Sequence, residues 1–204
     1  MANTLTRAQP FYMGDVFNSA HPLMAGGPEY PYFKETAGQT FKAGDLLYLD
    51  TNGTVAICTL TGQQLNSKIV GQATKDASGV TGTQVYFRVI RPDGIWCMNV
   101  MHATAASAVT ALTQLGALFG LRKDTVTGNG TNIWSVDIEN AVTGATADLA
   151  RVKVVGFPLK NPFDAGTLTR PAIGDIYGLV LVQFIMNASD TDGNPSLMNI
   201  LQMG

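Results

Sequence analysis

Few side chains in this sequence have the type and spacing that acid–base, nucleophilic or metal chemistry requires. The two histidines, His21 and His102, stand far apart, and no serine lies in the G-x-S-x-G pattern of a nucleophile elbow. Neither histidine has a second ligand at the spacing of a C-x-x-C or H-x-x-E-H zinc motif. We therefore predict no catalytic residue, no metal site and no cofactor, and we expect a protein that is not an enzyme.

One polar stretch, DTDGNP, has the beginnings of a metal-binding loop. Asp190, Asp192 and Asn194 alternate as at the start of a calcium loop. Such a loop needs glycine after its third ligand and glutamate at its end. Pro195 and Leu201 occupy those two positions, so the stretch is predicted to be a polar turn.

The composition indicates a protein that contacts other proteins through apolar surface. Its 204 residues are 46% hydrophobic and only 14% charged, with a net charge of −2. This balance gives no basic surface for nucleic acid, and it implies that a neighbouring subunit covers part of the apolar surface. The sequence contains neither a signal-peptide h-region nor an apolar run long enough to span a membrane. Cys58 and Cys97 lie in apolar segments and are expected to be buried, reduced thiols.

The first 38 residues differ in composition from the rest of the chain. Four prolines between positions 10 and 31 exclude a continuous helix or a central strand here. We predict an extended N-terminal arm, residues 1–38, followed by a β-barrel-like domain, residues 39–204. The arm carries the aromatic residues expected to make contacts: Phe11, Tyr12, Tyr30, Tyr32 and Phe33. Two placements stay open, one along the arm's own domain and one on a neighbouring subunit.

Beyond the arm, apolar residues alternate with a period of two. In the stretch FKAGDLLYLDTNGTVAI (residues 41–57), two such segments flank Asn52-Gly53, a pair typical of hairpin turns. Further strands are predicted at 69–73, in TQVYFRVI, in IWCMNVM, and in a hairpin made of GLRKD and IWSVDIEN. ARVKVVGFPL and YGLVLVQFIM complete the series, and the second is apolar enough for burial on both faces.

The remaining apolar pattern indicates one helix. Val109, Leu112, Leu115 and Leu118 recur at helical spacing within residues 103–119, although threonine and serine are frequent there. Many short strands separated by turn residues predict an all-β fold, either a barrel or a sandwich. The helix is expected as an insertion in that domain.

Two resemblances to known families bear on function. AIGDIYGLVLV (residues 172–182) resembles the Asp…Tyr-x-Gly strand of trimeric nucleotide hydrolases of the dUTPase type, in which a catalytic aspartate precedes a uridine-selective tyrosine. Here Asp175 and Tyr177 have a different separation, and the Arg-Ser-Gly motif that binds phosphate in that family is missing. The resemblance covers about ten residues.

A longer resemblance involves the capsid cement, or decoration, proteins of tailed bacteriophages. The order of Gly44-Asp45, Asp50, Asn52-Gly53 and then IVGQATKDAS is similar to their A-G-D-x-V-x-L-D-x-N-G hairpin followed by I-x-G-x-A-x-x-D-A. The later segments VKVVGFP and GDIYGLVLVQF are similar to the ends of larger head-auxiliary proteins. The similarity extends over residues 41–186.

This second resemblance implies a β-barrel or β-tulip-like subunit on the outer surface of a virion. It implies a structural protein made in the host cytoplasm whose partners are the major capsid protein and itself, as a homodimer or homotrimer. Alternatives are another virion barrel, in the tail, connector or receptor-binding apparatus, or a nucleotide hydrolase.

Overall fold

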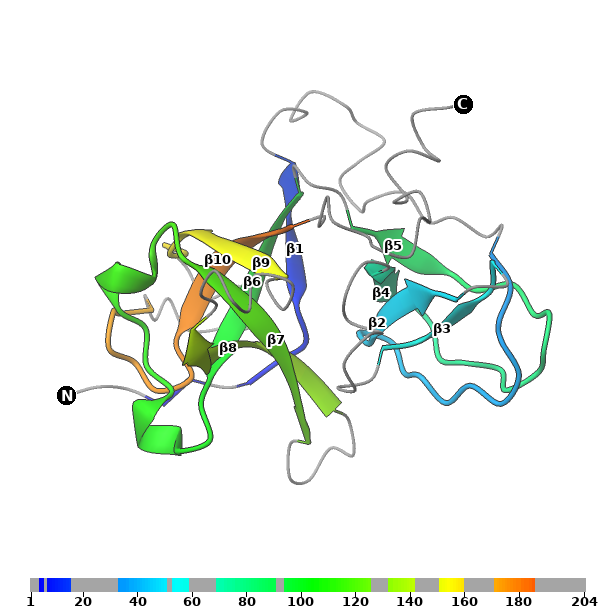
Figure 1. Cartoon of the computed structure of the whole chain (residues 1–204), viewed down its shortest axis with the longest axis horizontal. Helices are drawn as coiled ribbons and strands as arrows, with labels where there is room; N and C mark the ends of the chain where they lie inside the picture. The colour runs from blue at the N-terminus through cyan, green and yellow to red at the C-terminus, as the bar shows by residue number, and fades with distance from the viewer. Residues whose placement is uncertain are drawn as a thin grey trace. The chain divides into compact units, whose positions relative to one another are not determined.

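The computed structural model describes residues 4–5, 7–15, 33–50, 53–58, 69–90, 94–125, 132–141, 151–159 and 171–185. The chain forms two compact units (Figure 1). Unit 1 contains Met1–Ser19 and Pro92–Ile185, and unit 2 contains Ala20–Arg91 and Met186–Gly204. This division differs from the expected one into 1–38 and 39–204, because the two ends of the expected arm belong to different units.

Unit 1 is a closed β-barrel of five strands, and a sixth strand pairs with one of the five. Its strands are β1 (Phe11–Asp15), β6 (Gly94–Met101), β7 (Leu118–Thr125), β8 (Asn132–Ala141), β9 (Val152–Gly156) and β10 (Leu179–Phe184). The order is β1-β6-β10-β9-β7-β8, and a parallel pairing of β6 with β8 at Val100↔Val136 and Met101↔Asp137 closes the ring. The all-β prediction is confirmed.

Cross-strand register explains why β6 is buried along nearly its whole length. Side chains of directly paired residues lie on the same face of a sheet. Trp96 pairs with Val182 and Met98 with Val180, and all four side chains are fully buried, as expected inside the barrel. The alternate residues, Cys97 and Asn99, point to the outer face and are nevertheless 0% exposed. They are covered by the N-terminal segment, as described below.

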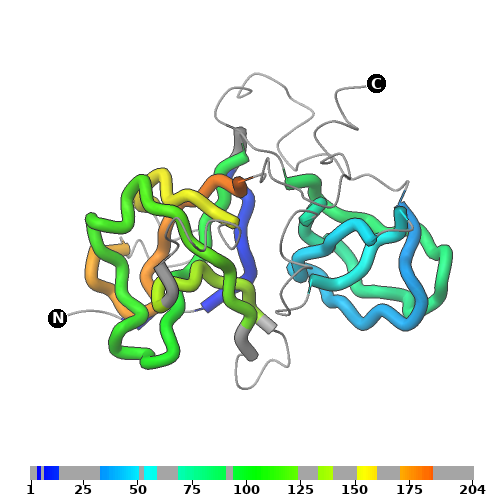
Figure 2. The backbone as a smooth tube through the Cα atoms, viewed as in Figure 1, coloured from blue at the N-terminus to red at the C-terminus, as the bar shows by residue number. Residues whose placement is uncertain are grey.

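Unit 2 is a four-stranded antiparallel sheet, and the segment at 33–36 packs along its first edge strand and the chain that enters its last strand. The strands are β2 (Leu46–Leu49), β3 (Val55–Ile57), β4 (Ile69–Ala73) and β5 (Phe87–Val89), in the order β3-β2-β4-β5. Lys34 bridges to Gln84 and Glu35 bridges to Val55, so the segment contacts the edge strand β3 and the residues that precede β5. In Figure 2 the chain can be followed from this segment into β2 and β3. The core consists of Phe41, Leu47, Val55, Val70, Ala73, Val85, Phe87 and Val89.

The hairpin predicted in residues 41–57 is confirmed. β2 and β3 pair antiparallel, and Gly53 has φ +72°, a value that favours glycine in a tight turn. The carboxylate of Asp50 accepts hydrogen bonds from the backbone N–H of Thr54 at 3.0 Å and from the Thr36 hydroxyl at 2.9 Å. Asp50 therefore holds the turn and also ties it to the segment that closes unit 2.

The other strand predictions hold at 69–73, in IWCMNVM, in the β7–β8 hairpin and in β9. In the last strand, β10, Leu181 and Gln183 are half-buried, so burial on both faces is only partial. Tyr177 and Gly178 precede β10 because Tyr177 has φ +53° and belongs to a turn.

The helix predicted at 103–119 is wrong. Two short 3₁₀ turns, η3 (Ala105–Ser107) and η4 (Leu112–Gln114), occur there, and β7 begins at Leu118. The backbone groups of this segment bond to other parts of unit 1: Ala108 O accepts from Tyr177 N at 2.7 Å, and Gly116 N donates to Val154 O at 2.8 Å. These tertiary bonds replace the bonds that a helix would make, and they outweigh a weak helical propensity.

Candidate interaction surface

The aromatic residues predicted as contacts have different environments. Phe11 lies on β1, opposite Cys97, and 43% of its surface is exposed. Tyr12 is half-buried, with its ring 5.3 Å from that of Trp96 in an edge-to-face arrangement. Phe33 packs on Phe87 in the core of unit 2, with the ring centroids 5.6 Å apart. Phe11 thus keeps a large part of its surface exposed, whereas Tyr12 and Phe33 pack within their own units.

Two of the predicted contact residues, Tyr30 and Tyr32, lie outside the described residues, as do His21 and the 190–195 turn. Residues 7–15 of the expected arm pack within unit 1, because β1 pairs antiparallel with β6. In the single chain described, this part of the arm therefore lies along its own barrel.

Next to Phe11, Met13 is also exposed. Its neighbourhood contains a β-bulge, since the register of β1 against β6 shifts between Tyr12 and Gly14. A bulge re-aims side chains and is common at sheet edges. Phe11 and Met13, each more than two-fifths exposed, form the β1 patch.

A second exposed apolar set lies on the loops at one end of the barrel. We call it the barrel-end cluster; its members are Leu112, Leu115, Leu159 and Ile173. Leu112 and Leu159 are 67% and 72% exposed, respectively. The spacing of Leu112 and Leu115 predicts a helix, and it gives no indication that both side chains are exposed. The signal that could have revealed it is the absence of any charged residue from 103 to 121.

Hydrogen bonds bring these loops together. Thr110 O accepts a bond from Gly174 N at 2.9 Å, and the Thr110 hydroxyl donates to Ala172 O at 3.3 Å. Gly178 has no room for a side chain, because a Cβ there would lie 2.6 Å from the Thr110 methyl group. The loop containing Leu112 is therefore held firmly against the loop containing Ile173.

A pocket of about 470 Å³ opens beside the barrel-end cluster. It is lined by the apolar residues Phe157, Pro158, Leu159, Pro171, Ala172 and Ile173. Sites for small molecules add a few convergent polar side chains that fix orientation. No lining side chain among the described residues supplies one.

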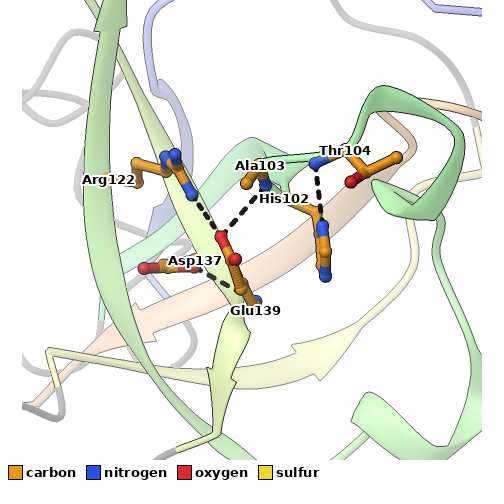
Figure 3. Close-up of polar contacts among 6 residues, drawn as sticks. All are labelled: His102, Ala103, Thr104, Arg122, Asp137 and Glu139. Carbon is orange, nitrogen blue, oxygen red and sulfur yellow. Dashed lines mark hydrogen bonds and ion pairs between the residues drawn. The ribbon is translucent and has the colours of Figure 1, made fainter.

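A polar cluster lies where β6 meets β8 (Figure 3). Arg122, on β7, and Glu139, on β8, form an ion pair of 2.6 Å, and Ala103 N donates to the same carboxylate oxygen at 3.0 Å. The Arg122 hydrogen bond, helped by the Ala103 N–H, lowers the pKa of Glu139 below its usual value. Glu139 thus stays ionised and fastens the chain leaving β6 to the β7–β8 hairpin.

His102 belongs to the same cluster, and its ring is held by the backbone of the chain that follows it. Its Nδ1 accepts a hydrogen bond from Thr104 N at 3.0 Å, so a neutral ring carries its proton on Nε2. Asp137 accepts from the backbone N–H of Glu139 at 3.1 Å (Figure 3). These contacts shape the end of the barrel. Among the described residues, no three His, Cys, Asp or Glu side chains are grouped so that they could hold a metal ion.

The residues that resemble a nucleotide-hydrolase strand build a turn. Asp175 is 1% exposed, and its carboxylate accepts the backbone N–H of Ala172 at 2.7 Å. Tyr177 donates its backbone N–H to Ala108 O at 2.7 Å, and the Arg7 guanidinium lies 5.2 Å from the centre of its ring. The Asp175 carboxylate and the Tyr177 backbone hold the turn that leads into β10, and the carboxylate is buried.

Comparison of the chain with protein-family models, with curated proteins and with solved structures finds no match in any of the three. In the part of the chain that the structure describes, no helix is long and apolar enough to cross a membrane.

Proposed function

We propose that this protein is an oligomeric capsid decoration protein, which binds the outer surface of a phage head and bridges major capsid proteins. The observation that carries the proposal is the pair of exposed apolar surfaces, the β1 patch and the barrel-end cluster, on a closed barrel. The ordered hairpin series that resembles decoration proteins supports it.

A bridging protein needs contact surfaces at more than one place. β1 pairs with the first half of β6, at Gly94 to Cys97, whereas the loop that carries Leu112 leaves the other end of β6 after Met101. The two surfaces can therefore be occupied at the same time. A protein that binds the assembled shell better than free shell subunits stabilises the shell by mass action.

The contacts should be apolar in character. No charged residue occurs between 103 and 121, and the polar cluster of Figure 3 is paired internally. Because salt screens interactions between exposed charges, attachment through this surface should change little between low and high salt. A loss of binding by high salt would contradict the barrel-end cluster as the contact.

The test is the number of copies on purified particles, measured by quantitative mass spectrometry relative to the major shell subunit. We expect copies in the hundreds, the order of magnitude that shell symmetry implies. Twelve copies or fewer would indicate a tail or vertex protein instead, and absence from particles would refute the proposal. Magnesium-dependent hydrolysis of a nucleotide by the purified chain would favour the enzyme alternative.

Variants locate the contact. The double substitution Leu112→Ser and Leu115→Ser should reduce binding to shells at least tenfold, since central apolar contacts dominate binding energy. Val80→Ser is the matched control, because Val80 is 62% exposed but belongs to unit 2. Equal binding by the double variant and the control would exclude the barrel-end cluster as the attachment surface.

A further inference from the structure

The chain's first described residues form a strap across the outside of the barrel. This N-terminal strap consists of Thr4, Leu5, Arg7, Ala8 and Gln9. Thr4 bridges to Ile176, and Leu5 N donates to Ile176 O at 2.9 Å. Ala8 N donates to the Asn99 side chain at 3.0 Å. The strap is therefore attached at both ends by hydrogen bonds to strands or turns of unit 1.

The strap fills an apolar groove on the outer face of the sheet. Leu5 packs with Cys97 and Leu179, next to the half-buried Leu181, and is itself only 8% exposed. Asn99, fully buried, forms the polar end of the groove: its Oδ1 accepts from Ala8 and its Nδ2 donates to Tyr177 O at 2.7 Å. The groove thus recognises a leucine and, three residues later, a backbone N–H.

The barrel does not need the strap to close. The pairing of β6 with β8 completes the ring, and the strap lies outside it. Gln9 supplements the edge of β8, where its side chain accepts a hydrogen bond from Trp134 N at 3.3 Å. Pro10, which has no backbone N–H to pair, separates the strap from β1. The strap is a short ligand joined covalently to its own binding groove.

We propose that the strap of one copy binds the groove of a second copy, so that exchanged straps link the subunits of a homo-oligomer. The contacts in the exchanged form are the same as those within one chain, which makes exchange a low-cost route to a dimer. The link to shell cementing rests on the proposed function, because crowding on a shell raises the local concentration of copies and favours exchange.

The test is a disulfide between strap and groove. Leu5→Cys is introduced into a chain carrying Cys58→Ser, which leaves Cys97 as the native partner. The purified full chain is oxidised at several concentrations and analysed on a non-reducing gel. We expect disulfide-linked dimers whose share increases with protein concentration. The same chain with Cys97→Ala should form none, which excludes links between two straps.

Two results would overturn the proposal. Oxidation that gives only the disulfide within one chain, at every concentration, would show that straps do not exchange. Failure of any disulfide to form would show that Leu5 does not lie beside Cys97. The assay contains no shells. Concentration-dependent dimers without particle binding would therefore refute the proposed function alone, and particle binding without dimers would refute strap exchange alone.

Labelling of the native Cys97 thiol gives an independent measure of how well the strap covers the groove. Burial raises the pKa of Cys97 to about 12, so the covered thiol reacts slowly. In the Cys58→Ser chain, Leu5→Ser should speed labelling of Cys97 at least tenfold, whereas Leu112→Ser should not. Equal rates in the two variants would show that the groove is closed by something other than the strap, and would overturn the proposal.

Discussion

Replacing Gly71 by alanine should open unit 2 and leave unit 1 intact. Gly71 lies on β4 between Leu47 of β2 and Val89 of β5. An alanine Cβ at this position would lie 2.3 Å from a ring carbon of Phe87 and 2.4 Å from the backbone oxygen of Arg88. Non-bonded carbon atoms are normally about 3.5–4.0 Å apart. β4 and β5 must therefore move apart by roughly an ångström at this point.

The cost of that separation can be bounded. Phe87 is fully buried and packs against Phe33, so its ring has little room to move, and the Arg88 oxygen is part of the sheet backbone. Overpacking of this kind costs about 1–3 kcal/mol. The loss of unfolded-state freedom on replacing glycine by alanine returns about 0.4–1 kcal/mol where the site is compatible, which does not offset a clash on this scale. We expect net destabilisation.

The two cysteines provide an assay that resolves the units. Cys58 and Cys97 are both fully buried and belong to unit 2 and unit 1, respectively. Labelling of a buried thiol follows local opening, so a cost of about 1–3 kcal/mol should raise the Cys58 rate roughly 5- to 150-fold. The Cys97 rate should stay as in the wild type, and the urea midpoint followed by circular dichroism should fall.

Gly156→Ala is the matched control. Gly156 also lies in a strand, but an added Cβ would make only an ordinary contact of 3.6 Å with Leu181. It should leave the free energy of unfolding unchanged or raise it by up to about 1 kcal/mol. Two results would contradict this prediction. Either Cys58 in the Gly71→Ala variant is labelled at the wild-type rate, or the variant speeds the labelling of Cys58 and Cys97 equally.

Two further predictions concern buried and paired carboxylates. Because Arg122 lowers the pKa of Glu139, the pair should stabilise the fold above the unfolded-state pKa of about 4.3 and lose that contribution as pH falls through the lower folded value. The difference in urea midpoint between wild type and Arg122→Met should shrink from pH 6 toward pH 2; a constant difference would contradict the ion pair's role. Glu35, 1% exposed, accepts three hydrogen bonds from the loop at 78–79, so Glu35→Gln should cost about 1.5–3 kcal/mol, measured by urea unfolding and Cys58 labelling. Asp76→Asn, on an exposed carboxylate, is its control; equal stability of the two variants would exclude the predicted role of Glu35.

Local patterns predicted most strands. A period of two in DLLYLD, in IVGQA and in IWCMNVM places alternate side chains on opposite faces, and turn residues such as Asn52-Gly53 mark where strands end. These signals act between near neighbours in the chain, so they can be read without the tertiary structure. The same reading failed for 103–119, where the partners of the backbone are Tyr177, Gly174 and Val154, which lie far along the sequence.

The candidate surface was only partly predictable. Phe11 was expected to contact a partner, and its exposure agrees with that expectation, although the contact itself stays a prediction. Phe33 is also an aromatic residue of the proline-rich first 38 residues, but it packs against the core of unit 2. Leu112 and Leu115 have the spacing of a helix, but in the structure they lie exposed at a 3₁₀ turn. Side-chain type alone does not distinguish an aromatic or aliphatic residue that meets its own core from one that meets a neighbour.

The sequence by itself determined that the chain forms short strands and tight turns, because alternation and turn chemistry are local properties. Only the tertiary structure decided how the strands close. The parallel pairing of β6 with β8 joins Val100 to Val136 across the intervening strand β7, and the segment at 33–36 bridges β3 and the residues that precede β5. Such pairings depend on the loop entropy and on packing summed over the entire unit, and no short stretch of residues records them.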